Sequence, residues 1–210
     1  MDNHPTLTPR RVQTREKLMD AAVSLFAEKG VLGASVEEIC ERAEFTRGAF
    51  YSNFASKDEL CLAVMNRQAE RDLAAAARTV AGLVDDMTAP TSLDELIERA
   101  VGVFLATQPR DPEDLVVSME LRLYGVRNPK LREPLLALTD EVAAELGGIM
   151  AQALTRERAR MTVPMSQAID LLHAVYVHSG ITALLNGLEP DDESRRRQLT
   201  VLLRSLVTVD

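Results

Sequence analysis

Polar side chains between residues 46 and 57 have the spacing of one exposed helix face. Arg47 and Tyr51 are four residues apart, as are Gly48 and Ser52, so each pair lies on the same side of a helix. An arginine can donate two hydrogen bonds to guanine in the major groove, and a tyrosine hydroxyl can donate one to a phosphate. This face therefore has the chemistry of a nucleic-acid contact.

The residues before this face predict a second short helix and a tight turn. Ser35 and Glu38 have the spacing of a capping box, which begins a helix. The apolar residues of this helix recur at i, i+3, i+4 and i+7, and they are Val36, Ile39, Cys40 and Ala43. Thr46 can cap the helix that follows. Two short helices joined by a tight turn form a helix-turn-helix.

This stretch resembles the DNA-binding domain of the TetR (tetracycline repressor) family of bacterial transcriptional regulators. The similarity covers about residues 11–62 and rests on the segments LFAEKG (25–30), SVEEI (35–39), YSNF (51–54) and SKDEL (56–60). With this resemblance, we expect the DNA-contacting residues to be Ser35, Thr46, Arg47, Gly48, Tyr51, Ser52, Asn53 and Lys57.

Glu44 departs from the family pattern, which usually has glycine in this turn. A residue other than glycine at positive φ costs roughly 1–2 kcal/mol. The turn therefore either bears that cost or avoids positive φ.

Several of these assignments have a structural alternative. Tyr51 can pack its ring as a half-buried aromatic residue, and Arg47 can be a solvated charge. Lys57 falls in the first turn of a helix, where a cation opposes the helix dipole, and this position hints at another use. Arg10 and Arg11 can reach the DNA backbone or minor groove, or belong to a solvated tail.

The composition is compatible with a DNA-binding protein, although the formal net charge is −8. The acidic excess follows residue 57, whereas the first 57 residues are close to neutral and carry the basic residues that could line one surface: Arg10, Arg11, Arg15, Lys17, Arg47 and Lys57. A local basic surface is sufficient for phosphate contacts. Cys40 and Cys61 lack metal-ligand spacing and are expected to be reduced thiols in a cytoplasmic protein. We expect no membrane span and no signal peptide.

Helical periodicity along all 210 residues predicts an all-α fold of about nine helices. We expect helices at about 9–29, 35–43, 46–54, 57–87, 92–108, 112–127, 129–160, 165–188 and 191–206, with breaks at 88–91 and 161–164. The Pro134 position leaves open whether 129–133 is a separate short turn. Residues 1–57 should form a helix-turn-helix domain of three helices, and residues 58–210 a helical bundle for ligand binding and dimerisation.

The ligand site is predicted from polar and aromatic residues within apolar helices. His173 and Tyr176 lie three apart in a helix that is apolar nearly all round, and a polar pair of this kind can anchor a small molecule. The other candidates for the same site are Phe104, Met119 and Tyr124. His173 and Tyr176 can instead be core residues with satisfied hydrogen bonds, and the other three can equally be plain core residues. No metal site, cofactor or catalytic motif is expected.

The same apolar helix, with the leucines of 191–206, predicts a dimer interface. The candidate residues are Leu184, Leu185, Leu199, Leu202, Leu203 and Leu206. Alternatively, the last helix only closes its own bundle. Arg195, Arg196 and Arg197 each follow an acidic residue by four, which favours ordinary pairing on the helix surface.

Resemblance to the family implies a homodimer that binds a palindromic double-stranded operator and releases it when a small, apolar effector binds the bundle. Two alternatives are a DNA-binding activator or architectural factor without an inducer, and a helical small-molecule carrier.

Overall fold

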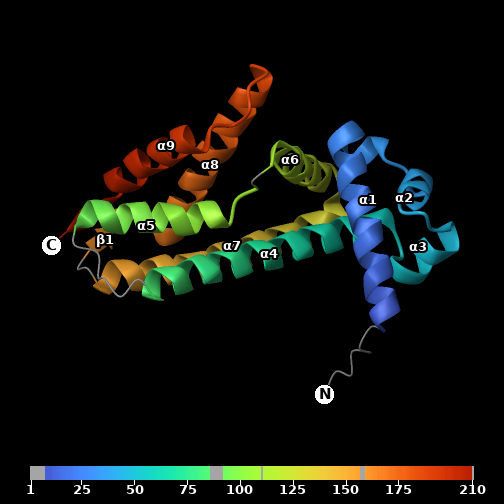
Figure 1. Cartoon of the computed structure of the whole chain (residues 1–210), viewed down its shortest axis with the longest axis horizontal. Helices are drawn as coiled ribbons and strands as arrows, with labels where there is room; N and C mark the ends of the chain where they lie inside the picture. Colours follow the sequence, from blue (N-terminus) through green and yellow to red (C-terminus); the bar gives the residue numbers. More distant parts are fainter. Residues whose placement is uncertain (1–7, 86–91, 110, 157–158, 210) are drawn as a thin grey trace. The chain divides into compact units, whose positions relative to one another are not determined.

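The computed structural model describes residues 8–85, 92–109, 111–156 and 159–209, and these residues are mostly helical (Figure 1). The helices are α1 (Pro9–Gly33), α2 (Val36–Arg42), α3 (Arg47–Asn53), α4 (Lys57–Asp85), α5 (Leu93–Ala106), α6 (Pro112–Arg127), α7 (Pro129–Arg156), α8 (Met165–Leu185) and α9 (Asp192–Ser205). The all-α expectation is confirmed. The predicted break at 88–91 lies outside the described residues.

The chain divides into two compact units. The first contains residues 1–67 and 116–135, and the second contains residues 68–115 and 136–210. Helices α4, α6 and α7 therefore each contribute residues to both units. The first unit is larger than residues 1–57 because it takes in the beginning of α4, most of α6 and the beginning of α7.

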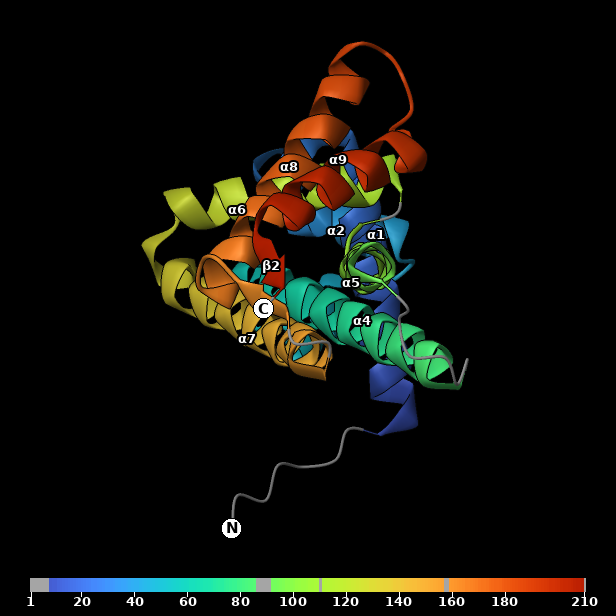
Figure 2. The ribbon, with the colours of Figure 1, turned by 90° about the vertical axis from the view of Figure 1, so that its left-hand side faces the viewer.

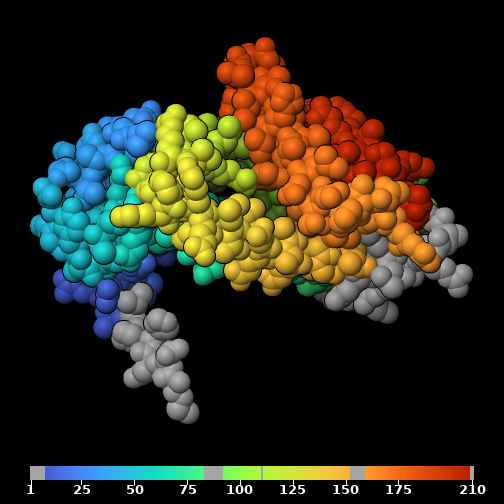
Figure 3. Space-filling model, turned by 180° about the vertical axis from the view of Figure 1, so that it is seen from behind, coloured from blue at the N-terminus to red at the C-terminus, as the bar shows by residue number. Residues whose placement is uncertain are grey.

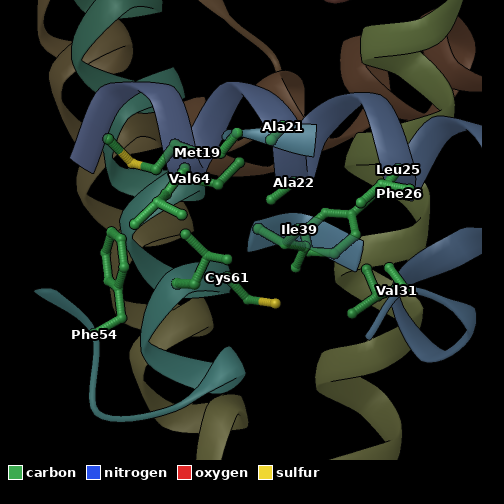
Figure 4. Close-up of a cluster of buried hydrophobic side chains, with 14 of the residues drawn as sticks. Met19, Ala21, Ala22, Leu25, Phe26, Val31, Ile39, Phe54, Cys61 and Val64 are labelled. Atoms are coloured by element: carbon green, nitrogen blue, oxygen red, sulfur yellow. The ribbon is translucent and has the colours of Figure 1, made fainter. Parts of the chain in front are cut away.

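The first unit is built around a core of apolar side chains from α1, α2, α3, α4 and α6. Figure 4 shows Phe26, Ile39 and Val31 converging from α1 and α2, with Cys61 and Val64 of α4 beside them. Val117 and Leu121 of α6 complete the same cluster. This core fixes the positions of the two short helices, which are too short to be stable in isolation.

The helix boundaries in the first unit follow from local capping. The capping box is present in both directions: the Glu38 amide donates to the Ser35 hydroxyl (3.2 Å), and the Ser35 amide donates to the Glu38 carboxylate (2.9 Å). Gly30 has φ 75° and ψ 164°, which breaks the helical path of α1 before Val31. The sequence predicted a helix end at this glycine, whereas α1 is kinked there and continues to Gly33.

The second unit packs α5, α8 and α9 around its own core. Helix α9 lies along both α5 and α8, as Figures 1 and 2 show. The core includes Phe104 of α5, Leu172 and Tyr176 of α8, and Leu199 and Leu203 of α9. These side chains are almost fully buried within the single chain.

In the second half of the chain, a short strand pair was not predicted, and the start of α7 was left open. Strands β1 (Ala159–Met161) and β2 (Val207–Val209) form an antiparallel pair, with Ala159 opposite Val209. The sequence analysis found no strand here because three residues are too few to display a period of two. Pro134 lies inside α7, so the helix begins at Pro129 without a separate turn.

Helix α8 is an exception to the expectation that no segment could cross a membrane. By length and composition alone it qualifies, with a mean hydropathy of 1.4, and only 28% of that window is buried in the single chain. Figure 3 shows α8 in orange on the surface of the second unit. Its exposed residues include the apolar Leu171 and Leu185 beside polar residues such as Asp170 and His178.

Candidate nucleic-acid interface

Helix α3 is held so that one side is buried and the other is exposed. The Thr46 hydroxyl caps the helix by accepting a hydrogen bond from the Ala49 amide at 3.2 Å. Phe50 and Phe54 are 0% and 1% exposed, and their rings lie 5.8 Å apart. The opposite side consists of exposed residues, and it contains Thr46, Arg47, Gly48, Tyr51 and Ser52. The predicted face is therefore present on the surface.

The carboxyl end of α3 is fastened by two arginines of α1. Arg11 donates from Nη2 to the Ser52 carbonyl at 3.1 Å, and Arg15 donates to the Asn53 carbonyl. The Arg15 guanidinium also lies 4.1 Å from the centroid of the Phe54 ring. These contacts satisfy carbonyls that a helix end leaves unpaired. Arg11 therefore belongs to an ordered helix, not to a solvated tail.

The turn between α2 and α3 adopts the strained geometry that the sequence left open. Glu44 has a φ of 59°, the one positive φ outside glycine among the described residues. The Phe45 amide donates to the Cys40 carbonyl at 2.9 Å and closes the turn. The turn thus bears the cost of a left-handed residue other than glycine.

Three of the expected contact residues are engaged inside the unit. Lys57 donates from Nζ to the carbonyls of Val31 (2.8 Å) and Ala34 (2.9 Å), which explains a cation in the first turn of α4. Asn53 is 7% exposed and donates to the Ala49 carbonyl at 2.8 Å. Ser35 is the cap residue of α2. Their DNA contacts remain predictions.

One acidic residue of this surface was missed by the sequence analysis. Glu37, in the first turn of α2, forms an ion pair with Arg47, with Oε1 and Nη1 2.7 Å apart. The sequence spacing does not predict this pair, because Glu37 and Arg47 lie on different helices and the turn between the helices brings them together. The hydrogen bond with the Tyr51 hydroxyl raises the pKa of Arg47, and the charge of Glu37 raises it further.

Two cysteines and one glutamate elsewhere in the first unit have shifted pKa values. Burial raises the pKa of the Cys61 thiol to about 12, and burial followed by the Glu37 charge raises that of Cys40. Both thiols are therefore protonated at neutral pH and are poor nucleophiles. The hydrogen bonds from Lys29 and Ser35 lower the pKa of the half-buried Glu38 carboxyl to about 2.

Of the five candidate ligand-site residues, the structure brings three together in the second unit. The rings of Phe104 and Tyr176 lie edge to face with centroids 6.4 Å apart. His173 Nδ1 is 3.1 Å from Oε1 of the buried Gln108, and the Tyr176 hydroxyl donates to the Pro109 carbonyl. Gln108, which the sequence analysis did not single out, supplies the polar partner in this core.

Met119 and Tyr124 lie in the first unit. The Tyr124 hydroxyl donates to Asp58 Oδ1 at 2.7 Å, and Asn128 donates to the other oxygen at 2.9 Å. Burial and the Asp58 carboxylate raise the pKa of Tyr124 to about 12. Tyr124 thus has an internal role that its position on a helical face did not predict.

The candidate dimer residues fall into two groups. Leu199 and Leu203 are 0% and 1% exposed within the single chain, so its own core already covers them. Leu185 is 83% exposed. The remaining candidates, which are half-buried, are Leu184, Leu202 and Leu206.

The three consecutive arginines of α9 do not share one environment. Arg197 pairs with Glu193 at 2.6 Å, as predicted, and Arg196 lies 3.9 Å from Glu98 of α5. Arg195 was wrongly placed on the helix surface. It is 4% exposed, pairs with Asp192 and lies 4.5 Å from the centroid of the Tyr176 ring. The aliphatic stem and the guanidinium of Arg195 pack against this ring, and the contact takes the place of hydration by water.

Among the described residues, no group of three or more His, Cys, Asp or Glu side chains could hold a metal ion.

Comparison with known proteins identifies relatives of the chain. A sequence model described as "Bacterial regulatory proteins, tetR family" matches residues 18–64. The HTH-type transcriptional regulator UidR of Escherichia coli (strain K12) is 26% identical over 205 residues, covering 90% of this chain and 97% of UidR. The HTH-type nicotine-responsive transcriptional repressor HdnoR of Paenarthrobacter nicotinovorans is 23% identical over 147 residues, covering 70% of this chain and 72% of HdnoR.

A solved structure agrees with these sequence matches. The multidrug binding protein EbrR, crystallised with imidazole, superposes with a TM-score of 0.56 at 26% identity, over 96% of this chain and 97% of EbrR. These homologues are transcriptional regulators and a multidrug binding protein, and none of the three is named as an enzyme.

Proposed function

Because the chain belongs to the TetR family of bacterial transcriptional regulators, we propose that it is a cytoplasmic repressor that binds a palindromic operator as a homodimer. A small, mainly apolar molecule binds the second unit and releases the DNA. The observation that carries this proposal is the exposed side of α3, on which Arg47, Tyr51 and Ser52 lie opposite the buried Phe50 and Phe54.

This side of α3 has the two kinds of contact that operator binding needs. Arg47 has a planar guanidinium that fits guanine O6 and N7, and so supplies base readout. The hydroxyls of Tyr51 and Ser52 fit phosphate oxygens, which fix the position of the helix on the duplex. Because Arg11 and Arg15 hold the carboxyl end of α3 from α1, the helix can dock as a preformed element.

Dimerisation follows from the small footprint of one such helix. A helix-turn-helix protein reads two half-sites about 34–36 Å apart, one through each subunit. The surface that we propose for the dimer is the uncovered side of α8, which includes Leu171 at 43% and Leu185 at 83% exposure. A second copy of the same helix would cover Leu171 and Leu185 across a two-fold axis.

The ligand proposal rests on the mixed core of the second unit. Phe104 and Tyr176 supply aromatic surface, while Gln108 and His173 supply a polar pair next to it. Apolar walls with a few convergent polar groups are typical of small-molecule sites. The name of HdnoR as nicotine-responsive and the imidazole complex of EbrR support an organic effector.

The proposal is tested by selecting DNA fragments from a random pool with the purified protein. We expect an inverted repeat to be enriched, and we expect its affinity to fall linearly in a plot of log K against log salt concentration, because phosphate contacts release counterions. If the protein enriches no sequence and shows no salt-dependent binding to duplex DNA, the proposal of operator binding is refuted. The interpretation as a small-molecule carrier would then remain. Operator binding that raises transcription in a reporter strain would replace repression with activation.

A further inference from the structure

The exposed side of α3 does not present Arg47 alone, because a carboxylate of α2 is paired with it. Oε1 of Glu37 and Nη1 of Arg47 are 2.7 Å apart, and the two side chains are 55% and 61% exposed. We infer that Glu37 is a specificity-determining residue: it orients the Arg47 guanidinium toward a G·C base pair and disfavours contacts with the phosphates of unrelated DNA. The inference rests on the proposed operator binding.

The geometry leaves the guanidinium able to read a base while it is held. Arginine has five N–H donors, and the contact with Glu37 occupies Nη1. The edge formed by Nε and Nη2 then stays available for O6 and N7 of guanine. The guanidinium carbon also lies 5.9 Å from the centroid of the Tyr51 ring. The carboxylate and the ring thus restrict the directions in which this flexible side chain can point.

The charge of Glu37 acts differently on specific and on nonspecific complexes. Nonspecific binding depends almost entirely on phosphate contacts. An unpaired Arg47 would contribute to such binding on any sequence, but here its charge is neutralised by an adjacent carboxylate, which also repels phosphates. In an operator complex the guanidinium reads a base edge and can keep its ion pair. The carboxylate therefore weakens the nonspecific complex more than the specific one.

Stability does not explain the pair. Ion pairs between exposed side chains contribute little to folding, and helix α2 is already capped by the next residue, Glu38, through Ser35. A carboxylate in the first turn of α2 is favourable for the helix dipole, but Glu38 also fills that role. What distinguishes Glu37 from its neighbour is its position beside Arg47.

The test compares Glu37→Gln with Glu41→Gln in the full-length protein. Glu41 is an exposed residue on the same helix that is not part of the Arg47 ion pair, so both variants remove one negative charge. Affinities for the selected operator and for an unrelated duplex of equal length are measured by fluorescence anisotropy at several salt concentrations. Circular dichroism verifies that both variants are folded.

We expect Glu37→Gln to tighten binding to the unrelated duplex about 10-fold, to change operator affinity less than 3-fold, and to relax the selected sequence at one G·C pair. Glu41→Gln should leave the ratio of the two affinities within 2-fold of wild type. In an Arg47→Gln background, Glu37→Gln should no longer change this ratio, because the paired cation is gone.

Equal effects of Glu37→Gln and Glu41→Gln on both duplexes would overturn the inference, since they would reflect net charge alone. An unchanged affinity ratio in Glu37→Gln would overturn it as well. If Glu37→Gln were unfolded, Glu37→Ala in the same assay decides by the same criteria. A wild-type protein without sequence preference is a separate result, which refutes the proposed operator and this inference together.

Discussion

Gly30 offers the sharpest test of how the first unit is assembled. Its backbone has φ 75° and ψ 164°, a combination that is essentially restricted to glycine and costs other residues of order 1–3 kcal/mol. A Cβ atom at this position would lie 2.6 Å from Oε2 and 3.1 Å from Cδ of Glu120. The Glu120 carboxylate would therefore have to move away from the chain.

The movement has its own cost because Glu120 is bonded at this point. Oε2 accepts a hydrogen bond from the Val31 amide at 3.2 Å, and a hydrogen bond to a charged group contributes about 1.5–3 kcal/mol. This hydrogen bond is partly exposed and long, so we take its contribution from the lower end of that energy range. Alanine gains about 0.4–1 kcal/mol by restricting the unfolded chain. We therefore expect Gly30→Ala to destabilise the protein by about 2–4 kcal/mol.

Two further variants separate the contributions in urea unfolding followed by circular dichroism. Gly33, in the same segment, has no positive φ, and an added Cβ would meet only ordinary contacts with the Lys29 side chain from 3.5 Å. Gly33→Ala should thus be neutral or stabilising by up to about 1 kcal/mol. In a Glu120→Ala background, Gly30→Ala should cost only the backbone strain less the gain in the unfolded chain, about 0.5–2.5 kcal/mol. A Gly30→Ala protein as stable as Gly33→Ala would refute this reasoning.

The remaining predictions concern the turn, the cap, the dimer and the ligand. Glu44→Gly should raise the free energy of unfolding by about 0.5–1 kcal/mol in urea, because relief of the left-handed backbone outweighs the entropy of glycine. The pKa of Glu38 is lowered from 4.5 to about 2, so its contribution to stability is present above pH 4.5 and is lost as the pH falls toward 2. When the free energy of unfolding is measured across this pH range, Glu38→Gln should differ least from wild type at the acidic end. Leu185→Glu should sediment as a folded monomer with weakened operator affinity, whereas Leu136→Glu, also on an exposed leucine, should remain dimeric. His173→Phe should keep operator binding but require more inducer for release of the operator when inducer is titrated in. An unchanged dose-response would show that His173 is not the polar group that binds the ligand.

The features that the sequence predicted correctly are those that depend on neighbours within a few residues. Ser35 and Glu38 cap each other across three positions, and the Thr46 hydroxyl caps α3. The burial of Phe50 and Phe54 follows from helical spacing. Such contacts are local, so residue types and intervals are sufficient to predict them.

The contacts that the sequence did not predict join residues far apart in the chain. The ammonium of Lys57 donates to carbonyls more than twenty residues earlier, and its expected phosphate contact stays a prediction. The Tyr124 hydroxyl donates to Asp58, and its expected ligand contact stays a prediction. Arg195 was expected in solvent, yet it lies against Tyr176. Charge and aromatic character indicate that a residue will find a partner, but only the tertiary arrangement decides which partner.

The organisation of the first unit has the same origin. Residues 1–57 contain the helix-turn-helix, but its core also includes Leu60, Cys61 and Val64 of α4 and Val117 and Leu121 of α6. The polar contacts follow the same pattern, since segment 116–135 supplies the acceptor for the Val31 amide and both partners of Asp58. A short helix pair has too little apolar surface to fold without such help. The positions of α2 and α3, and therefore of Glu37 and Arg47, depend on residues more than sixty positions further along the chain.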